Sequence, residues 1–486
     1  MSSDSSRMIQ QLRADFEKLL VFVTGPQAHQ ATLDQMERSL FRQVLRLGLK
    51  LLQLFLNTRI QAESHAPQPG PGKTQLPYHS QKPLDYFSIF GKLTFRRAYF
   101  YQAGQAGRCP LDSALSLPDS CYSDLLMESA ELLGVDGAYD KSLQVLERLL
   151  GLTVAESALE STLVEHADDV KPFYHQKPKF SARDEGPILV SQADGKGVPM
   201  VRRETTLLKA RLSKGDKKTR KKEAIAIAVY TIAPYRRTPA AVVAALFKKG
   251  KPPLARPAPC HKQVFASLDG KDAAFKRLAE WVKRRDGGPV CARVALTDGA
   301  EALQKHRQAN LPGFTLVLDI IHVDEHVWQA GTALYGETNM QRAAWVETQM
   351  GDILSSRVEM VIQRLEARAQ KFPKKGSVGK VLHQVANYLR RNRDYMDYAE
   401  YLRQGWPIGT GVIEGTCRHL VKDRMEQSGM RWTVSGAGAL LALRAVNENG
   451  DWETFHSYRR IQRHKLLHRT PLNTHWLDQA ERLEIN

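Results

Sequence analysis

Five short apolar segments in the middle of this chain limit the folds it can adopt. Each is rich in Val, Ile, Leu and Ala, and most end at Asp or Gly, as is typical of strands buried on both faces of a sheet. A helical pattern at residues 272–285 falls between the third and the fourth segment. The sequence therefore predicts an α/β core with a mixed five-stranded sheet and flanking helices. The five segments are residues 188–195, 223–232, 262–270, 291–299 and 314–322.

The flanking regions have other periodicities and predict further domains. Helical apolar spacing precedes and follows an alternating segment typical of a β-hairpin, and Gly151 separates two of the later helices. These later helices predict a helix-turn-helix, which is either a DNA-binding domain or ordinary helical packing. The predicted regions are an N-terminal helical region (1–65), a small β module (80–118), a helical region (119–175), the α/β core (185–325 and 406–460), an all-α insertion within it (326–405) and a basic tail (461–486).

The chain is strongly basic. Lys and Arg total 70 and Asp and Glu total 52, which gives a formal net charge of +18 at pH 7. This excess favours a polyanionic partner, because binding to phosphates releases their condensed counterions, although solubility is another use of basic residues. The densest run, KGDKKTRKK at residues 214–222, is either a solvated loop or a phosphate contact. Nucleic acid is the predicted class of partner.

The cysteines and the apolar content argue against other classes of protein. The five cysteines are scattered without a CxxC spacing, so we expect neither a disulfide framework nor a zinc site. No segment approaches the roughly 18 apolar residues of a membrane span, and the N-terminus lacks the apolar core of a signal peptide. We expect a cytoplasmic protein with no membrane partner.

Three carboxylates are placed where they could hold metal ions. Asp194 and Asp298 each follow an apolar run and precede a glycine, and Glu414 begins a basic helix after the insertion. An Asp at the end of a buried strand needs a partner, such as a divalent cation, although capping a helix or forming an Asp-Gly turn is its commoner role. Two strands and a late helix can converge on two ions about 3.5 to 4 Å apart, which suits displacement at phosphorus.

Four motifs resemble one protein family. QADGKG, LTDGAEAL, DIIHVDEHVW and GTGVIEGTCRHLVKDRMEQSGMRW are similar to motifs of the DDE transposases of ISKra-type insertion sequences, relatives of Mutator-like elements. The resemblance covers approximately residues 80 to 460. It implies an RNase H-like core in a bacterial, nucleoid-associated enzyme. It also implies that Asp194, Asp298 and Glu414 bind two Mg²⁺ or Mn²⁺ ions.

Asp319 and His322 match a further motif of that family, an Asp or Cys followed after two residues by His. The resemblance implies that His322 is catalytic and assists at the scissile phosphate. Its alternative role is that of a hydrogen-bonded residue at a strand–helix junction. Asp319 ends the predicted fifth strand much as Asp194 and Asp298 end theirs, so it competes with Asp298 for a place in the triad.

The residues around Glu414 are the predicted DNA contacts. Arg418, Lys422 and Arg424 follow on the same helix, where they could hold a DNA strand by its phosphates or form a solvated face. Trp432 either stacks on an unpaired base or is an ordinary buried aromatic residue.

Together these features predict a DNA transposase. It would bind the ends of an insertion sequence, cleave phosphodiester bonds and join 3′ hydroxyls to target DNA. Its partners would be double-stranded transposon ends and target DNA, and the pairing of two ends predicts a homodimer or larger homo-oligomer. The alternatives are an inactive or regulatory DNA-binding protein and a related nuclease without strand transfer.

Overall fold

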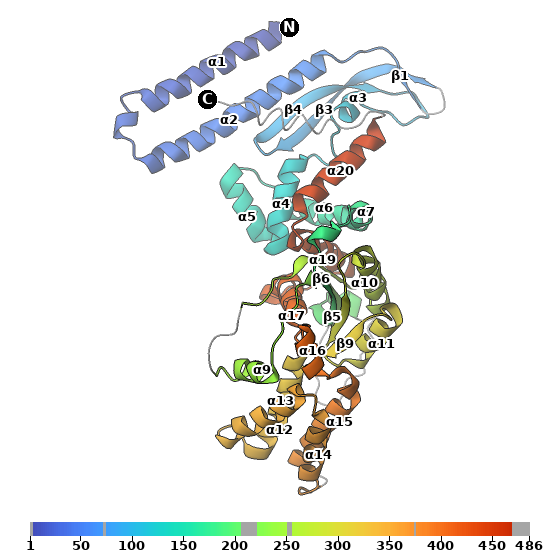
Figure 1. Ribbon diagram of the computed structural model, residues 1–486. Coiled ribbons are helices and arrows are strands. Elements are labelled where there is room, and N and C mark those ends of the chain that lie inside the picture. Colours follow the sequence, from blue (N-terminus) through green and yellow to red (C-terminus); the bar gives the residue numbers. More distant parts are fainter. Residues whose placement is uncertain (1–2, 71–73, 206–220, 250–254, 374–375, 469–486) are drawn as a thin grey trace. The chain divides into compact units, whose positions relative to one another are not determined.

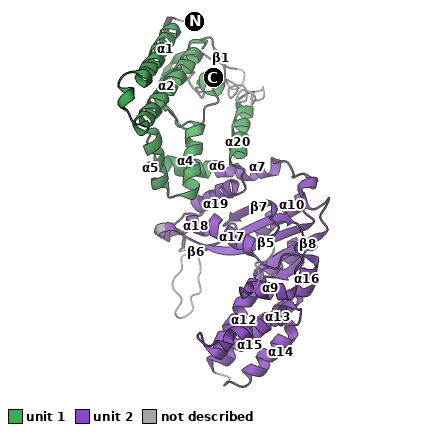
Figure 2. Cartoon of the chain, turned by 60° about the vertical axis from the view of Figure 1, so that its left-hand side comes forward, with its two compact units in different colours: residues 1–165, 452–486 green, residues 166–451 purple. Residues whose placement is uncertain are grey.

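The computed structural model describes residues 3–70, 74–205, 221–249, 255–373 and 376–468 (Figure 1). The chain divides into two compact units, one of residues 1–165 with 452–486 and one of residues 166–451 (Figure 2). Most of the basic run at 214–222, and the tail beyond residue 468, lie outside the described residues. None of the described helices has the length and apolar character that a membrane span requires.

The first unit contains the predicted N-terminal helices and hairpin. Gly151 ends α5 in the left-handed region, with φ 68°, which is the break that the sequence predicts between two helices. Leu56 of α2 packs with Leu93 and Phe95 of the hairpin in a small apolar core. The elements are α1 (Ser3–Thr24), α2 (Leu33–Gln61), β3 (Tyr78–Ser88), β4 (Gly91–Phe100), α3 (Pro110–Ala114), α4 (Asp124–Asp136), α5 (Tyr139–Leu150), α6 (Glu156–Asp168, which runs into the second unit) and α20 (Trp452–Leu467).

The second unit is built on a mixed five-stranded sheet, as predicted. The strands are β5 (Ile188–Pro199), β6 (Lys221–Ile232), β7 (Cys260–Ser267), β8 (Ala292–Thr297) and β9 (Thr315–Leu318). Their order is β7-β6-β5-β8-β9, with antiparallel pairing among β5, β6 and β7 and parallel pairing of β5 with β8 and of β8 with β9. This mixed α/β architecture is compatible with an RNase H-like fold.

Helices cover the sheet. Every residue of β6 from Ala224 to Thr231 is buried, as expected for a strand covered on both faces. Helix α10 (Lys271–Arg285) packs against β5 and β6, α11 (Glu301–Asn310) packs against β8, and α19 (Val434–Glu448) packs against β7.

The predicted helical insertion follows β9 directly, at residue 320 rather than 326. Its helices are α12 (Ile320–Tyr335), α13 (Gln341–Leu354), α14 (Val358–Ala369), α15 (Ser377–Asn392) and α16 (Tyr398–Gln404). Val361 and Leu365 of α14, and Val385 and Leu389 of α15, repeat at helical spacing and are all buried. They share one hydrophobic core with Val317 of β9, so the insertion and the sheet form a continuous packed body.

Candidate active site

Asp194 and Asp298 occupy equivalent positions along two neighbouring parallel segments, Asp194 within β5 and Asp298 directly after β8. The last residue pair that β5 and β8 share is Gln192 with Leu296. Asp194 and Asp298 each follow two residues later in their own segment. Because parallel strands advance together, this register brings the first two predicted carboxylates to one edge of the sheet.

Asp194 does not end its strand, which corrects the prediction. It pairs with Ala226, and β5 continues beside β6 as far as Pro199. The antiparallel neighbour β6 extends beyond the point where β8 stops, so β5 keeps one hydrogen-bonded edge after it has lost the other. The carboxylate therefore projects from within a strand, where the backbone fixes its direction.

The surroundings of Asp194 favour a counter-ion. Burial raises the pKa of this carboxyl group, and the negative charge of Asp298 raises it further. Hydrogen bonds from the Gly195 N–H, at 2.6 Å, and the Cys417 thiol, at 3.4 Å, act in the opposite direction. The charge of His322 also lowers this pKa. Asp194 thus interacts electrostatically with two other predicted site residues.

Asp298 occupies a tight turn that the helical insertion holds in place. Its Oδ1 accepts a hydrogen bond from Ala300 N at 2.9 Å, and its carbonyl oxygen accepts one from the Tyr388 hydroxyl at 3.0 Å. Gly299 has φ +93°, and Arg391 donates to its carbonyl oxygen at 3.0 Å. Two residues of α15 therefore fix the backbone that carries Asp298.

Asp319 is a fully buried hydrogen-bond acceptor between two segments. It caps α12 by accepting from His322 N at 3.1 Å, and the same Oδ2 lies 2.5 Å from His322 Nδ1. Its Oδ1 accepts from Thr410 N at 3.0 Å. The hydrogen bond with Asp319 raises the pKa of His322 to about 9, although burial opposes this shift. Asp319 thus joins the two ends of the helical insertion and also orients the histidine.

Glu414 lies next to this pair. It is exposed on α17 (Gly411–Thr416), and its Oε1 accepts a hydrogen bond from the Thr410 hydroxyl at 2.7 Å. Ligand atoms of Asp319, His322 and Glu414 all lie within 4.8 Å of one another. The third predicted carboxylate is therefore beside Asp319 and His322, and this group of described residues includes the competing candidate Asp319 but neither Asp194 nor Asp298.

The carboxylates suit a hard divalent cation. Mg²⁺ and Mn²⁺ take oxygen ligands. Asp194 and Asp298 repel each other, and Asp319 and Glu414 contribute two further carboxylates, so a divalent cation would offset part of this repulsion. The donor set therefore fits the predicted ions.

A buried arginine contacts the strand that carries Asp194. Arg307 of α11 is completely buried and donates from Nη2 to the carbonyl oxygen of Ala193 at 2.7 Å, while its Nε and Nη1 have no hydrogen-bond partner in the described part of the chain. Burial lowers the pKa of Arg307 to about 10, whereas the charges of Asp298 and Asp194 raise it. Arg307 therefore offsets part of the repulsion between the two carboxylates.

Gln192 and Cys417 connect the helix of Glu414 to β5. The Gln192 side-chain oxygen accepts from Ile413 N at 2.8 Å, and its amide nitrogen donates to the Tyr230 hydroxyl at 3.0 Å. Cys417 begins η5 (Cys417–Lys422), a π-helical turn that continues α17. Such turns are rare, and they are frequent at functional sites.

The predicted DNA contacts separate into two groups. Arg418 and Lys422 are exposed on η5, as a phosphate contact requires. Arg424 is only 1% exposed and lies 4.9 Å from the Trp432 ring centre in a cation–π contact. Trp432 is 8% exposed and donates from Nε1 to the Met425 carbonyl oxygen. The expectation that Arg424 and Trp432 contact DNA does not agree with this burial, because both side chains pack into the interior.

Sequence reasoning missed the residues that support the carboxylates. Arg307 could have been noticed, because it falls four residues after Leu303 on the apolar face of α11. Gln192 interrupts an apolar strand segment, which is another readable signal for a buried hydrogen-bonding group. Tyr388 and Arg391 lie about ninety residues away in a separate segment, so no local pattern indicates them.

Comparison with models of known protein families gives no match, and comparison with curated protein sequences also gives none. Among solved structures, a chain of the Drosophila P element transposase strand transfer complex is similar, with 10% sequence identity and a TM-score of 0.23. The similarity covers 70% of this chain and 81% of that chain. A TM-score of 0.23 is too low to assign a fold or a function, so both depend on the residues described above.

Proposed function

We propose that this protein is a DNA transposase of the DDE type, with Asp194, Asp298 and Glu414 as the ligands of two Mg²⁺ or Mn²⁺ ions. The observation that supports the proposal is the register of β5 and β8, in which Asp194 and Asp298 each follow the last shared residue pair by two residues. Glu414 has its ligand atoms within 4.8 Å of those of Asp319 and His322. Double-stranded DNA is the proposed substrate, and the net charge of +18 supports a polyanionic partner.

Each residue of the site has a proposed task. When bound, the two ions supply an activated oxygen nucleophile and stabilise the leaving oxygen at phosphorus. Asp319 holds Nδ1 of His322, which leaves Nε2 of that ring to contact a scissile phosphate. Exposed Arg418 and Lys422 hold the DNA strand by its phosphates. The same site would serve hydrolysis and strand transfer, since only the attacking oxygen differs.

The test is cleavage and joining of a labelled duplex that contains the terminal repeats flanking the coding sequence. The full-length protein is compared with Asp194→Asn, Asp298→Asn and Glu414→Gln, in Mg²⁺ and in Mn²⁺. Asp272→Asn is the matched control, because its side chain is 85% exposed on α10. We expect each triad variant to lose at least a hundredfold in rate, and the control to keep the wild-type rate.

Other outcomes would assign a different function. Metal-dependent cleavage that survives Asp298→Asn but not Asp319→Asn would place Asp319 in the triad instead. Cleavage without joining would identify a nuclease, and binding without cleavage in either metal would identify a regulatory protein. The rise in melting temperature on addition of Mn²⁺ gives a second readout, which should be largest for the wild type and the control.

A further inference from the structure

A second basic surface lies in the unit of residues 166–451, between α7 (Val170–Gln176) and α10. It is a hollow of about 330 Å³. Glu280 provides the one carboxylate of its lining. The basic side chains that line it are those of Lys171, His175, Lys179, Arg277, Lys283 and Arg284.

Helical spacing explains why these basic residues face one another. Lys171 and His175 are four residues apart on α7 and therefore share one face of that helix. Arg277, Trp281 and Arg284 follow the same rule on α10, at intervals of four and three residues. The two helices thus present basic faces to the same hollow.

Three of these cations lack an acidic partner. Lys171, Lys179 and Lys283 are exposed, and none of their side chains forms an ion pair or a hydrogen bond with the described residues. Arg277 lies 3.6 Å from the Phe265 ring centre and interacts electrostatically with Asp269 and Glu280, while its buried Nη1 has no hydrogen-bond partner among the residues that the structure describes. Like charges so close together repel one another, so the hollow is suited to an anion that contacts several cations at once.

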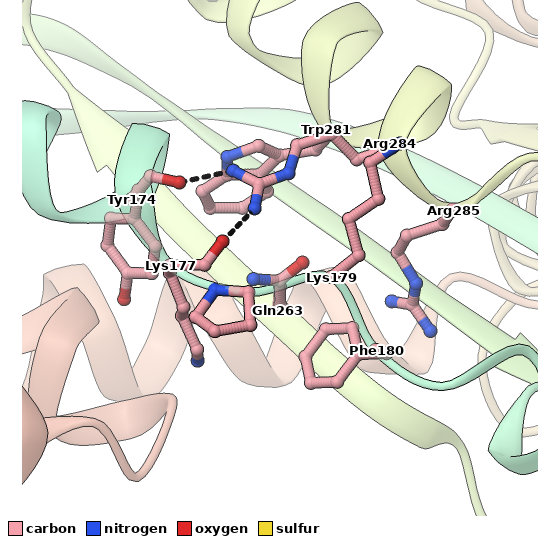
Figure 3. Close-up of a pocket in the computed structure, with 9 residues that line it drawn as sticks. Tyr174, Lys177, Lys179, Phe180, Gln263, Trp281, Arg284 and Arg285 are labelled. Carbon is pink, nitrogen blue, oxygen red and sulfur yellow. Dashed lines mark hydrogen bonds between the residues drawn. The ribbon is translucent and has the colours of Figure 1, made fainter.

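The hollow is held in shape before any ligand arrives. Figure 3 shows the Arg284 guanidinium donating to the backbone carbonyl oxygens of Tyr174 and Lys177, which joins α10 to the end of α7. The Tyr174 hydroxyl accepts a hydrogen bond from Asn449 at 2.7 Å, and Lys177 forms an ion pair with Asp451 at 2.5 Å. A preorganised cationic surface binds without the cost of ordering its own backbone.

We infer that this hollow binds the phosphates of duplex DNA, as a contact separate from Arg418 and Lys422. The aromatic residues favour a backbone phosphate over a free nucleotide, because Trp281 is 5% exposed and Tyr174 is 6% exposed, so neither ring is available to stack on a base. The inference rests on the proposed function, since it supplies a second anchor for the same DNA.

The test measures binding of an arbitrary labelled duplex by fluorescence anisotropy, in EDTA and over a range of salt concentrations. The full-length protein is compared with a triple variant, Lys171→Ala with Lys179→Ala and Lys283→Ala. The matched control is Lys380→Ala, at an exposed lysine of α15 in the same unit that forms no ion pair with any described residue. We expect the slope of log K against log salt to become about 2 to 3 units shallower in the triple variant, and about one unit at most in the control.

A labelling experiment on the wild-type protein avoids any dependence on the folding of the variant. Lysine acylation read by mass spectrometry should show that DNA protects Lys171, Lys179 and Lys283 more than Lys380. Equal protection, or an unchanged salt slope in the triple variant, would overturn the inference and leave the proposed function intact. Protection by a nucleoside triphosphate but not by the duplex would also overturn it. Absence of duplex binding by the wild type would overturn the proposed function itself.

Discussion

The side-chain oxygen of Gln192 accepts a hydrogen bond from the backbone N–H of Ile413, 2.8 Å away. Gln192 lies on β5 two residues before Asp194, and Ile413 precedes Glu414 on α17. A buried amide therefore joins the strand of the first aspartate to the helix of the glutamate. Both of its polar groups are occupied, since its nitrogen donates to the Tyr230 hydroxyl.

Replacing Gln192 by Leu should separate catalysis from DNA binding. The variant leaves Ile413 N and the Tyr230 hydroxyl without this partner, at a cost of about 1–3 kcal/mol for each buried group. We expect the cleavage rate to fall about 10- to 100-fold, as for other residues that orient metal ligands, with the Kd for DNA unchanged. Single-turnover cleavage and anisotropy measure the two quantities. Gln308→Leu, at an exposed position on α11, should change neither, and a wild-type rate in Gln192→Leu would contradict the proposed coupling.

Asp298→Asn and Asp319→Asn should have different effects on the metal-free protein. Removing the charge of Asp298 relieves its repulsion with Asp194 but also removes its attraction to Arg307, so the melting temperature in EDTA should change little. Asp319 is buried and accepts three hydrogen bonds, from His322 and Thr410, so the amide should lower stability by about 1–3 kcal/mol. Thermal unfolding followed by circular dichroism makes the comparison. A loss of stability in both variants would mean that Asp298 has a structural role as well.

Gly299 is a position where a methyl group should be harmful. Its φ is +93°, and an added Cβ would lie 2.9 Å from Tyr388 Cε2. We expect Gly299→Ala to cost about 1–3 kcal/mol of stability and to reduce cleavage, because the Asp298 turn must shift. Gly351→Ala is the control, since a Cβ there meets nothing within 4 Å inside α13, and it should stabilise by about 0.5–1 kcal/mol. Urea unfolding measures both, and equal effects would contradict the strain argument.

The buried ion pair of Glu185 with Arg285 should make stability depend on acid pH. The two side chains are 4% and 2% exposed. Burial acts to raise the pKa of Glu185, but hydrogen bonds from Arg285 and Thr231 outweigh it and hold the pKa below its usual value. A lowered folded-state pKa gives stability that is present above about pH 4.5 and is lost as pH falls through the folded-state value.

Glu185→Gln tests this pair. At pH 7 the variant leaves Arg285 without its carboxylate, and we expect a loss of about 3–5 kcal/mol in the free energy of unfolding. Its stability should then depend less on pH between 5 and 3 than that of the wild type. Urea titrations at several pH values measure the difference. Glu301 forms an ion pair with Lys305 at the surface, and the two side chains are 59% and 71% exposed. Glu301→Gln should therefore change the free energy of unfolding at pH 7 much less.

The sequence predicted the five strands and the helical insertion because their apolar periodicity is local. The strand order depends on which strands pair, and the continuation of β5 to Pro199 depends on the length of its neighbour β6. Neither can therefore be predicted from the sequence of a single segment. The burial of Arg424 and Trp432 follows from tertiary packing: Trp432 N donates to the Pro199 carbonyl oxygen, more than two hundred residues away in the chain. The sequence after Glu414 does not show that Arg424 and Trp432 are buried whereas Arg418 and Lys422 are exposed.

The helical insertion is hydrogen-bonded to the backbone that carries Asp298. Tyr388 and Arg391, one turn apart on α15, donate hydrogen bonds to the carbonyl oxygens of Asp298 and Gly299. Asp319, directly before the first helix of the insertion, accepts a hydrogen bond from Thr410 N, beyond its last helix. A partner that tilts the distal end of α15 would pull on the peptide of the second aspartate without touching any carboxylate. A displacement of this part of α15 would therefore reach the backbone of Asp298 through these two hydrogen bonds.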